Sequence, residues 1–262
     1  MANSSVKKKE ELKLFLEEKY RQYNKDFFIE TDPVSIPHLF NERKDIEIAG
    51  FLTATIAWGQ RPVILRNARE LLIRMDNRPA DFISSFTEAD LKSFRSFKHR
   101  TFNYEDLILF LKSLKRLYRK YPSPEELLLE KITPNDIHLK SAISNWRKEF
   151  FKSVTEGRSG KHFSDPERGS AAKRINMFLR WMIRKDEFGV DFGLWSKISP
   201  ALLICPLDVH SGRVGRKLGL LKRRADDWKA AEELTDSLKK FDPADPVKYD
   251  FALFGLGVFE RF

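Results

Sequence analysis

The stretch that decides the fold of this chain reads Ile46-Glu47-Ile48-Ala49-Gly50-Phe51-Leu52-Thr53-Ala54-Thr55-Ile56-Ala57-Trp58. It is almost wholly apolar, and a helix that is apolar on every side belongs in the middle of a core. Gly59-Gln60-Arg61-Pro62 interrupts it, and Pro62 suits the first turn of a following helix over residues 63–75. We therefore expect a buried central helix with other helices packed around it.

Helical periodicity continues on both sides of this stretch, and strand alternation is almost absent. A first helix is expected before Asp32-Pro33. The other predicted helices cover residues 79–84, 88–93, 104–119, 137–154, 171–184, 208–218 and 227–239, with a final apolar segment from Pro246 to Phe262. With no repeat and no long linker, the sequence predicts one all-α unit of two lobes with a central cleft: residues 46–155 form one lobe, and residues 1–45 with 156–262 form the other.

The composition favours a polyanionic partner. The 262 residues include 48 Lys and Arg against 38 Asp and Glu, a formal net charge of +10. A basic balance of this size raises the expectation of nucleic acid binding without proving it. Cys205 is the single cysteine, which excludes an intrachain disulfide, a four-cysteine zinc site and a cysteine-ligated iron–sulfur cluster.

The sequence shows no targeting or membrane segment. No apolar run follows Met1, and no stretch of about 18 apolar residues occurs. We expect a cytoplasmic protein that needs no metal or cofactor and has no membrane partner. Its oligomeric state is open, with a monomer favoured.

One candidate functional residue is Asp208, in Pro206-Leu207-Asp208-Val209-His210. An aspartate before a helix is a favoured N-cap, worth about 1 kcal/mol, and capping alone can explain it. The next turns of the predicted helix carry Arg213 and Arg216. A carboxylate with a basic face behind it also suits chemistry beside a phosphodiester, so both interpretations stand.

Lys173 is the second candidate. It follows Gly169-Ser170-Ala171-Ala172 and falls in the first turn of a predicted helix, where the helix dipole disfavours a cation. The neighbouring Arg174 adds like charge. Both effects favour a free amine, which is a nucleophile. The alternative is an ordinary solvated lysine.

Two further segments suit contact with nucleic acid. In Trp58-Gly59-Gln60-Arg61 a glutamine stands where a buried helix ends, and there it can fill the hole left by an extruded base or serve as an ordinary loop amide. The segment from Phe97 to Asn103 places His99 and Arg100 among aromatics before a helix. This arrangement suits phosphate contact or base stacking, although aromatics beside charges are common at helix starts.

Together these segments carry a resemblance. The residues from Pro206 to Val214 resemble the (V/L)-D-(T/V)-H-x-x-R-(V/I) signature of the helix-hairpin-helix DNA glycosylase superfamily, which includes endonuclease III and the 8-oxoguanine glycosylases. Ala171-Ala172-Lys173 before an apolar helix resembles that superfamily's lysine. The helix over 46–58 and Gln60 resemble its early helix and duplex-filling residue. The order of elements agrees over residues 46–258, and the whole chain also resembles a bacterial family of unknown function.

The resemblance implies base-excision repair of damaged duplex DNA. In that superfamily a lysine attacks the sugar C1′ of an extruded nucleotide, and the resulting Schiff base permits strand cleavage, an AP-lyase activity. An aspartate stabilises the cationic sugar and positions or deprotonates the lysine. Transferred to this chain, Lys173 is the nucleophile and Asp208 its partner. The residues implied to contact DNA are Gln60, Arg61, His99, Arg100, Arg174, His210, Arg213 and Arg216, and those implied to line a base pocket are Trp58, Tyr249, Asp250 and Phe254.

The sequence also departs from the superfamily pattern. The usual L-P-G-V-G-x-K hairpin is replaced by the segment from Asp165 to Lys173, so its bound monovalent cation is in doubt. Lys173 and Asp208 are 35 residues apart, about twice the typical spacing. An archaeal 8-oxoguanine glycosylase type has a similarly long spacing, which makes an oxidised purine the expected substrate. The alternatives are a non-catalytic DNA-binding module on the same scaffold and a helical protein that binds RNA or a protein partner.

Overall fold

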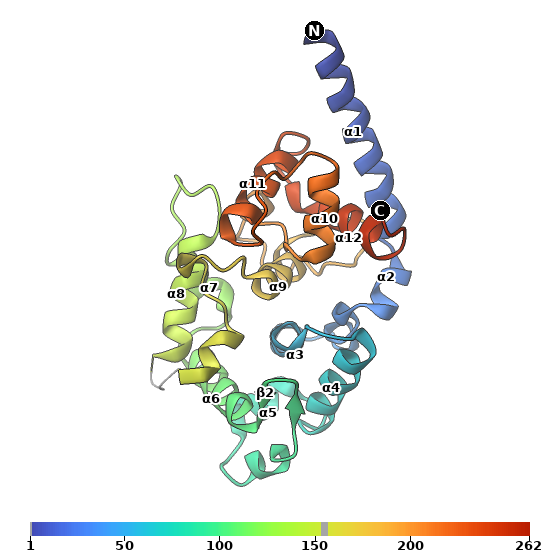
Figure 1. Ribbon diagram of the computed structural model, residues 1–262. Helices are drawn as coiled ribbons and strands as arrows, with labels where there is room; N and C mark the ends of the chain where they lie inside the picture. Colours follow the sequence, from blue (N-terminus) through green and yellow to red (C-terminus); the bar gives the residue numbers. More distant parts are fainter. Residues whose placement is uncertain (1, 153–156) are drawn as a thin grey trace.

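The computed structural model describes residues 2–152 and 157–262, and these residues are predominantly helical, as the all-α prediction requires (Figure 1). The α-helices are α1 (Ala2–Tyr23), α2 (Asp26–Thr31), α3 (Arg43–Ile56), α4 (Arg61–Ile73), α5 (Pro79–Ser85), α6 (Tyr104–Lys120), α7 (Pro124–Leu129), α8 (Lys140–Phe151), α9 (Lys173–Ile183), α10 (Val209–Lys217), α11 (Trp228–Lys239) and α12 (Asp250–Val258).

Short elements connect these helices. The 3₁₀ turns are η1 (Pro33–Ser35), η2 (Pro37–Leu39), η3 (Asp90–Phe94), η4 (Gly157–His162), η5 (Pro166–Arg168), η6 (Pro200–Leu202) and η7 (Pro246–Tyr249). The segment that was expected to place cations before α6 forms a tight antiparallel hairpin of β1 (Lys98–His99) and β2 (Phe102–Asn103). The helix predicted over 137–154 begins at Lys140, and its last two residues lie outside the described part of the chain.

Helix α3 is the centre of the core, as its sequence predicts. Every residue from Ile46 to Ile56 is buried. Gly50 lets α9 approach closely, since an added Cβ would lie 3.2 Å from the ring of Phe178. Phe51 is surrounded by aromatic rings from several elements, namely Phe110, Trp146, Phe150, Phe163 and Phe178. Aromatic burial of this kind accounts for much of the stability of a core.

The one charged residue in the apolar stretch, Glu47, is also fully buried. Its Oε1 accepts hydrogen bonds from Ser123 Oγ at 2.7 Å and Trp195 Nε1 at 2.7 Å. Arg43 Nε donates to the same oxygen at 2.9 Å, and the Tyr118 hydroxyl donates to Oε2 at 3.0 Å. Because a buried carboxylate is tolerated only when it is well hydrogen-bonded, these partners fix α3 relative to α6 and α7.

The helices form two groups around α3 and α9. Figure 1 shows α3 to α6 and the hairpin in the lower half and α9 to α12 in the upper half. Helices α3 and α9, one from each expected lobe, pack against each other, and α1 packs against α12. The two groups therefore share one hydrophobic core, and the division into lobes 46–155 and 1–45 with 156–262 stays a prediction. Among the described residues, no helix is both long and apolar enough to cross a membrane.

Candidate active site

Lys173 is the first residue of α9, and an unusual turn sets its position. After η5, Gly169 has φ +85° and Ala172 has φ +47°, in the left-handed region that residues with a Cβ rarely adopt. The loop is held to the start of α11, where the amide of Trp228 donates to the carbonyl of Gly169 at 3.0 Å. This segment directs Lys173 away from the core, with 35% of its side chain exposed.

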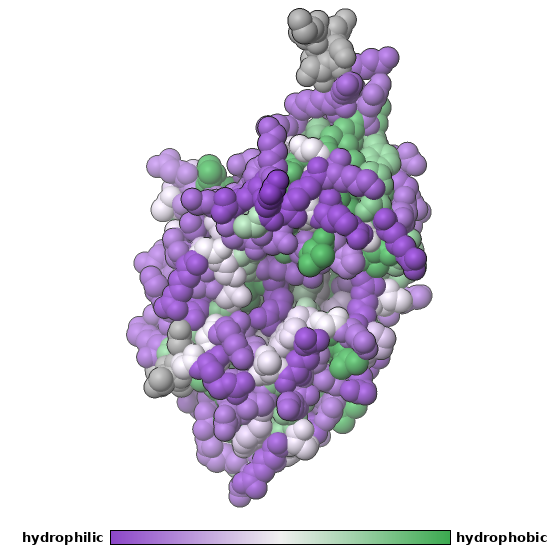
Figure 2. Space-filling view, in the orientation of Figure 1, coloured by the Kyte–Doolittle hydropathy of each residue, from purple (hydrophilic) through white to green (hydrophobic). Residues whose placement is uncertain are grey.

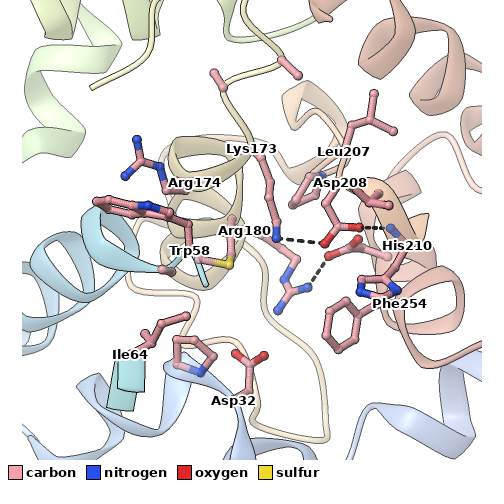
Figure 3. A pocket seen from close by; sticks show the side chains of 18 of the residues that line it. Asp32, Trp58, Ile64, Lys173, Arg174, Arg180, Leu207, Asp208, His210 and Phe254 are labelled. Atoms are coloured by element: carbon pink, nitrogen blue, oxygen red, sulfur yellow. Dashed lines mark hydrogen bonds and ion pairs between the residues drawn. The ribbon is translucent and has the colours of Figure 1, made fainter. Parts of the chain in front are cut away.

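Asp208 caps the N-terminus of α10, as its sequence position predicts. Its Oδ1 accepts hydrogen bonds from the backbone amides of His210 and Ser211, both at 2.8 Å. In return, Ser211 Oγ accepts from the Asp208 amide at 2.9 Å, which completes a capping box. The other oxygen, Oδ2, lies 2.9 Å from Lys173 Nζ (Figure 3). The expectation that these two side chains face each other is confirmed.

This environment keeps Asp208 ionised. Burial raises the pKa of Asp208, but the charge of Lys173, its hydrogen bond and the amide of Ser211 together outweigh burial, so the pKa lies below its ordinary value. The carboxylate is therefore anionic at neutral pH. A fixed anion beside an amine can stabilise a developing positive charge in the cleft.

The pair lies in the wall of a cleft of about 840 Å³, which is within the usual size of ligand sites. Figure 2 shows a hollow on this face with mostly hydrophilic residues around it. Several elements contribute, and the lining includes Phe28, Asp32, Trp58, Gly59, Arg61, Ile64, Lys173, Arg174, Met177, Arg180, Asp208, His210, Asp250 and Phe254. The cleft thus combines apolar walls with a few charged groups, which is the usual composition of a ligand site.

Two of the charged groups form a buried ion pair beneath Lys173. Arg180 Nη1 lies 2.5 Å from Asp250 Oδ2, and its Nε donates to Asp191 Oδ1 at 3.2 Å. Burial raises the pKa of Asp250 to about 6, although Arg180 opposes the shift. Arg180 and Met177 were not among the residues predicted to line the cleft. Met177 and Arg180 follow Lys173 by four and seven residues, and this spacing is the available signal, because it places all three on one face of α9.

Trp58 lines the cleft and is held by two residues that were expected to contact DNA. His99 Nε2 is hydrogen-bonded to the Trp58 carbonyl at 3.0 Å, and Asn67 is hydrogen-bonded to His99 Nδ1 at 3.0 Å. Arg174 donates to the Thr55 carbonyl, and its guanidinium lies 4.6 Å from the centre of the Trp58 ring.

The burial of His99 contradicts the prediction that this residue contacts DNA. The residue is 1% exposed, and burial lowers its pKa despite the hydrogen bond to Trp58. A buried, neutral imidazole cannot bind a phosphate at the surface. His99 and Arg174 instead support the wall that Trp58 forms.

Other predicted DNA contacts lie at the rim. Gln60 is exposed at the N-cap of α4, and Arg100 is exposed with its guanidinium against Gly59. Arg61 lines the cleft, and its guanidinium lies 4.9 Å from the ring centre of Phe254. Arg61 therefore connects α4 with α12.

The C-terminal candidates divide between the cleft and the surrounding structure. His210 lines the cleft, and its Nδ1 is buried with no hydrogen-bond partner among the described residues. Arg213 donates to the Gly257 carbonyl at 2.9 Å, and Arg216 lies 2.5 Å from Asp226 Oδ1. Tyr249 is fully buried away from the cleft with its hydroxyl 2.5 Å from Glu17 Oε1, so its predicted place in a base pocket was wrong.

The fold and the cleft define an all-α protein with a lysine–aspartate pair in an inter-helical cleft. Among the described residues, no group of three or more His, Cys, Asp or Glu side chains is arranged to hold a metal ion. Residues 32–259 match the family of proteins of unknown function DUF2400, and the chain belongs to this family. The predicted resemblance to a family of unknown function is thereby confirmed. No curated protein and no solved structure matches the chain.

Proposed function

We propose that this protein is a base-excision DNA glycosylase with AP-lyase activity, in which Lys173 is the nucleophile. The observation that supports this proposal best is the 2.9 Å separation of Lys173 Nζ and Asp208 Oδ2 at the wall of the cleft. Two helix N-termini hold the pair, although 35 residues separate them in sequence. The proposed substrate is damaged duplex DNA, with an oxidised purine as the excised base.

Lys173 and Asp208 have different roles in the proposed reaction: Lys173 is the nucleophile, and Asp208 stabilises charge. The neutral Lys173 amine attacks the sugar C1′ while the bond from C1′ to the base breaks, and the departing base takes the bonding electrons and the proton that the nitrogen loses. The anionic Asp208 stabilises the positive charge that develops on the sugar. Its lowered pKa makes it a weak base, which favours an electrostatic and positioning role. Opening of the sugar ring, in which O4′ takes the remaining proton of the nitrogen, gives an imine on Lys173. Loss of a C2′ proton to solvent then expels the 3′ phosphate.

The remaining residues suit an extruded nucleotide. A base inside a duplex must leave the stack before this chemistry, and the apolar walls from Trp58, Met177 and Phe254 can receive it. Gln60 is exposed where it can fill the vacated position. The net charge of +10 favours binding to the phosphate backbone.

Borohydride trapping tests the proposal. Wild type should become covalently linked to duplexes that contain an abasic site or 8-oxoguanine, because borohydride reduces the imine. Lys173→Gln should abolish the link. Lys148→Gln, which changes an exposed lysine on α8 outside the cleft, should retain it.

The outcomes separate the alternatives. Release of base without crosslinking would support glycosylase activity and contradict a Schiff base on Lys173. If wild type neither crosslinks nor releases base from any lesion, the proposal fails. Tight DNA binding would then favour a non-catalytic DNA-binding module, and preference for structured RNA would favour an RNA-binding protein.

A further inference from the structure

Asp32 is a cleft residue that the proposed reaction does not use. It follows α2 and caps η1, where its Oδ1 accepts from the amide of Val34 at 3.1 Å. The residue is only 7% exposed and lines the cleft. Figure 3 shows its carboxylate pointing into the cleft, on the side opposite Lys173. Among the residues that the structure describes, none donates a hydrogen bond to its second oxygen, Oδ2.

Capping of η1 accounts for only one of the two carboxylate oxygens of Asp32. The chain uses serine for the same purpose before η6, where Ser199 accepts from the amide of Ala201 and precedes Pro200. A serine at position 32 would cap η1 without adding a second, acidic oxygen to the cleft lining. The oxygen that does not cap η1 is left available to the cleft, where it can accept a hydrogen bond from a bound ligand.

Asp32 lies near three cations in a partly apolar part of the cleft. Burial raises the pKa of Asp32 above its ordinary value, and the positive charges of Arg180, Arg61 and Lys173 limit this rise. The next residue, Pro33, also lines the cleft. Figure 3 shows Ile64 on one side of Asp32 and Phe254 on the other. An aromatic base between these walls would present its edge to the carboxylate.

We propose that Asp32 determines specificity by accepting hydrogen bonds from N–H groups on the edge of the extruded base. The inference rests on the proposed glycosylase function and narrows its substrate to guanine-type purines. A guanine-type edge carries a ring N–H beside an amino group, and both donate to a carboxylate. An adenine-type edge places a ring nitrogen acceptor there, which would face Asp32 without a proton between them.

Base release from paired lesions tests this role. Duplexes carrying 8-oxoguanine or 8-oxoadenine at one position are compared for wild type, Asp32→Asn and Asp32→Ser. Asparagine and serine both cap, so η1 is kept, and thermal denaturation checks the fold. Release is normalised to borohydride crosslinking on the same duplex with an abasic site, which carries no base to recognise.

Wild type should release 8-oxoguanine faster than 8-oxoadenine, and both variants should reduce that preference about tenfold or more, the usual effect of a lost hydrogen bond to a charged group. Asp165→Asn is the matched control, since Asp165 caps η5 before Pro166 and does not line the cleft. It should keep the wild-type preference.

Failures of the two proposals are distinguishable. If wild type crosslinks to abasic DNA but shows no preference for 8-oxoguanine, or if both variants keep the preference, the role of Asp32 is overturned and the glycosylase stands. If wild type neither crosslinks nor releases base, the glycosylase proposal itself fails.

Discussion

Asp208 uses its two carboxylate oxygens for different interactions. Oδ1 is bound by the amides at the start of α10, and Oδ2 meets Lys173. The cap therefore fixes the direction in which the second oxygen points. Because the cap hydrogen bonds also favour the ionised form, capping and the proposed function support each other.

Asp208→Asn separates these two roles. Asparagine caps a helix about as well as aspartate, and the lost ion pair involves a Lys173 side chain that is about one-third exposed and screened by solvent. The free energy of unfolding should therefore fall by about 1 kcal/mol or less, while base release should fall on the order of 100- to 1000-fold. Urea denaturation and single-turnover kinetics measure the two effects.

Asp227→Asn is the matched control for this variant. Asp227 also caps a helix, α11, and pairs with a cation, Arg223, at 2.5 Å, but its side chain does not line the cleft. It should keep full activity. Equal activity of Asp208→Asn and wild type would contradict the role given to Asp208.

The raised pKa of Asp250 predicts that the free energy of unfolding depends on pH. Its pKa of about 6 in the folded protein exceeds the ordinary value of about 3.9. Between these values the folded state holds a proton that the unfolded state has lost, so the stabilisation is complete below about pH 4 and disappears as the pH rises through about 6. From pH 4 to pH 7, wild type should lose on the order of 1–3 kcal/mol relative to Asp250→Asn. If urea denaturation gives the same difference in free energy of unfolding between wild type and Asp250→Asn at every pH, this prediction is wrong.

At the scale of elements, the site depends on where helices begin. Helices α9 and α10 both start at the cleft, and the first residue or the cap of each carries a proposed functional group. The chain reaches α9 through Ala172, whose φ of +47° is strained for a residue with a Cβ. The strain lies one residue from Lys173, where the turn sets the direction of the helix.

Two neighbouring alanines test this strain. Ala172→Gly should raise the free energy of unfolding by up to about 1 kcal/mol, because glycine adopts a positive φ without penalty. Ala171→Gly should lower it by about 0.5–1 kcal/mol, because Ala171 is not among the residues with positive φ and only the unfolded chain gains freedom. Chemical denaturation measures both. Effects of the same sign would argue against strain at Ala172.

At the scale of the whole molecule, the cleft is assembled from remote segments. Asp32 and Trp58 come from the N-terminal third, Lys173 from α9, and Asp208 and Phe254 from the last quarter of the chain. The packing of α3 against α9 and of α10 against α12 brings them together. The site therefore exists only in the complete fold.

The overall charge predicts steeply salt-dependent DNA binding. Each phosphate contact adds about 0.9 to the slope of log affinity against log salt concentration. Wild type should show a slope of several units, and Arg100→Gln at the exposed rim should reduce it by about one. Lys148→Gln should leave it unchanged. Fluorescence anisotropy over a salt series measures the slope, and a flat dependence would rule out binding through phosphates.

The sequence by itself determined much of the secondary structure. The buried α3, the amphipathic α6 and α11 and the cap at Asp208 were all predicted, because periodicity and capping act between residues a few positions apart. The pairing of Lys173 with Asp208 was expected only through the resemblance, since nothing local relates residues 35 positions apart.

Only the tertiary structure decided which polar groups reach the cleft. Arg180 and Asp32 lie there, whereas Tyr249 and His99 are buried elsewhere as structural supports. Whether a side chain meets the cleft or the core depends on which distant helix covers it, and that is set by close packing of the whole chain rather than by neighbours in sequence. Local physics placed the helices, and long-range packing assembled the site.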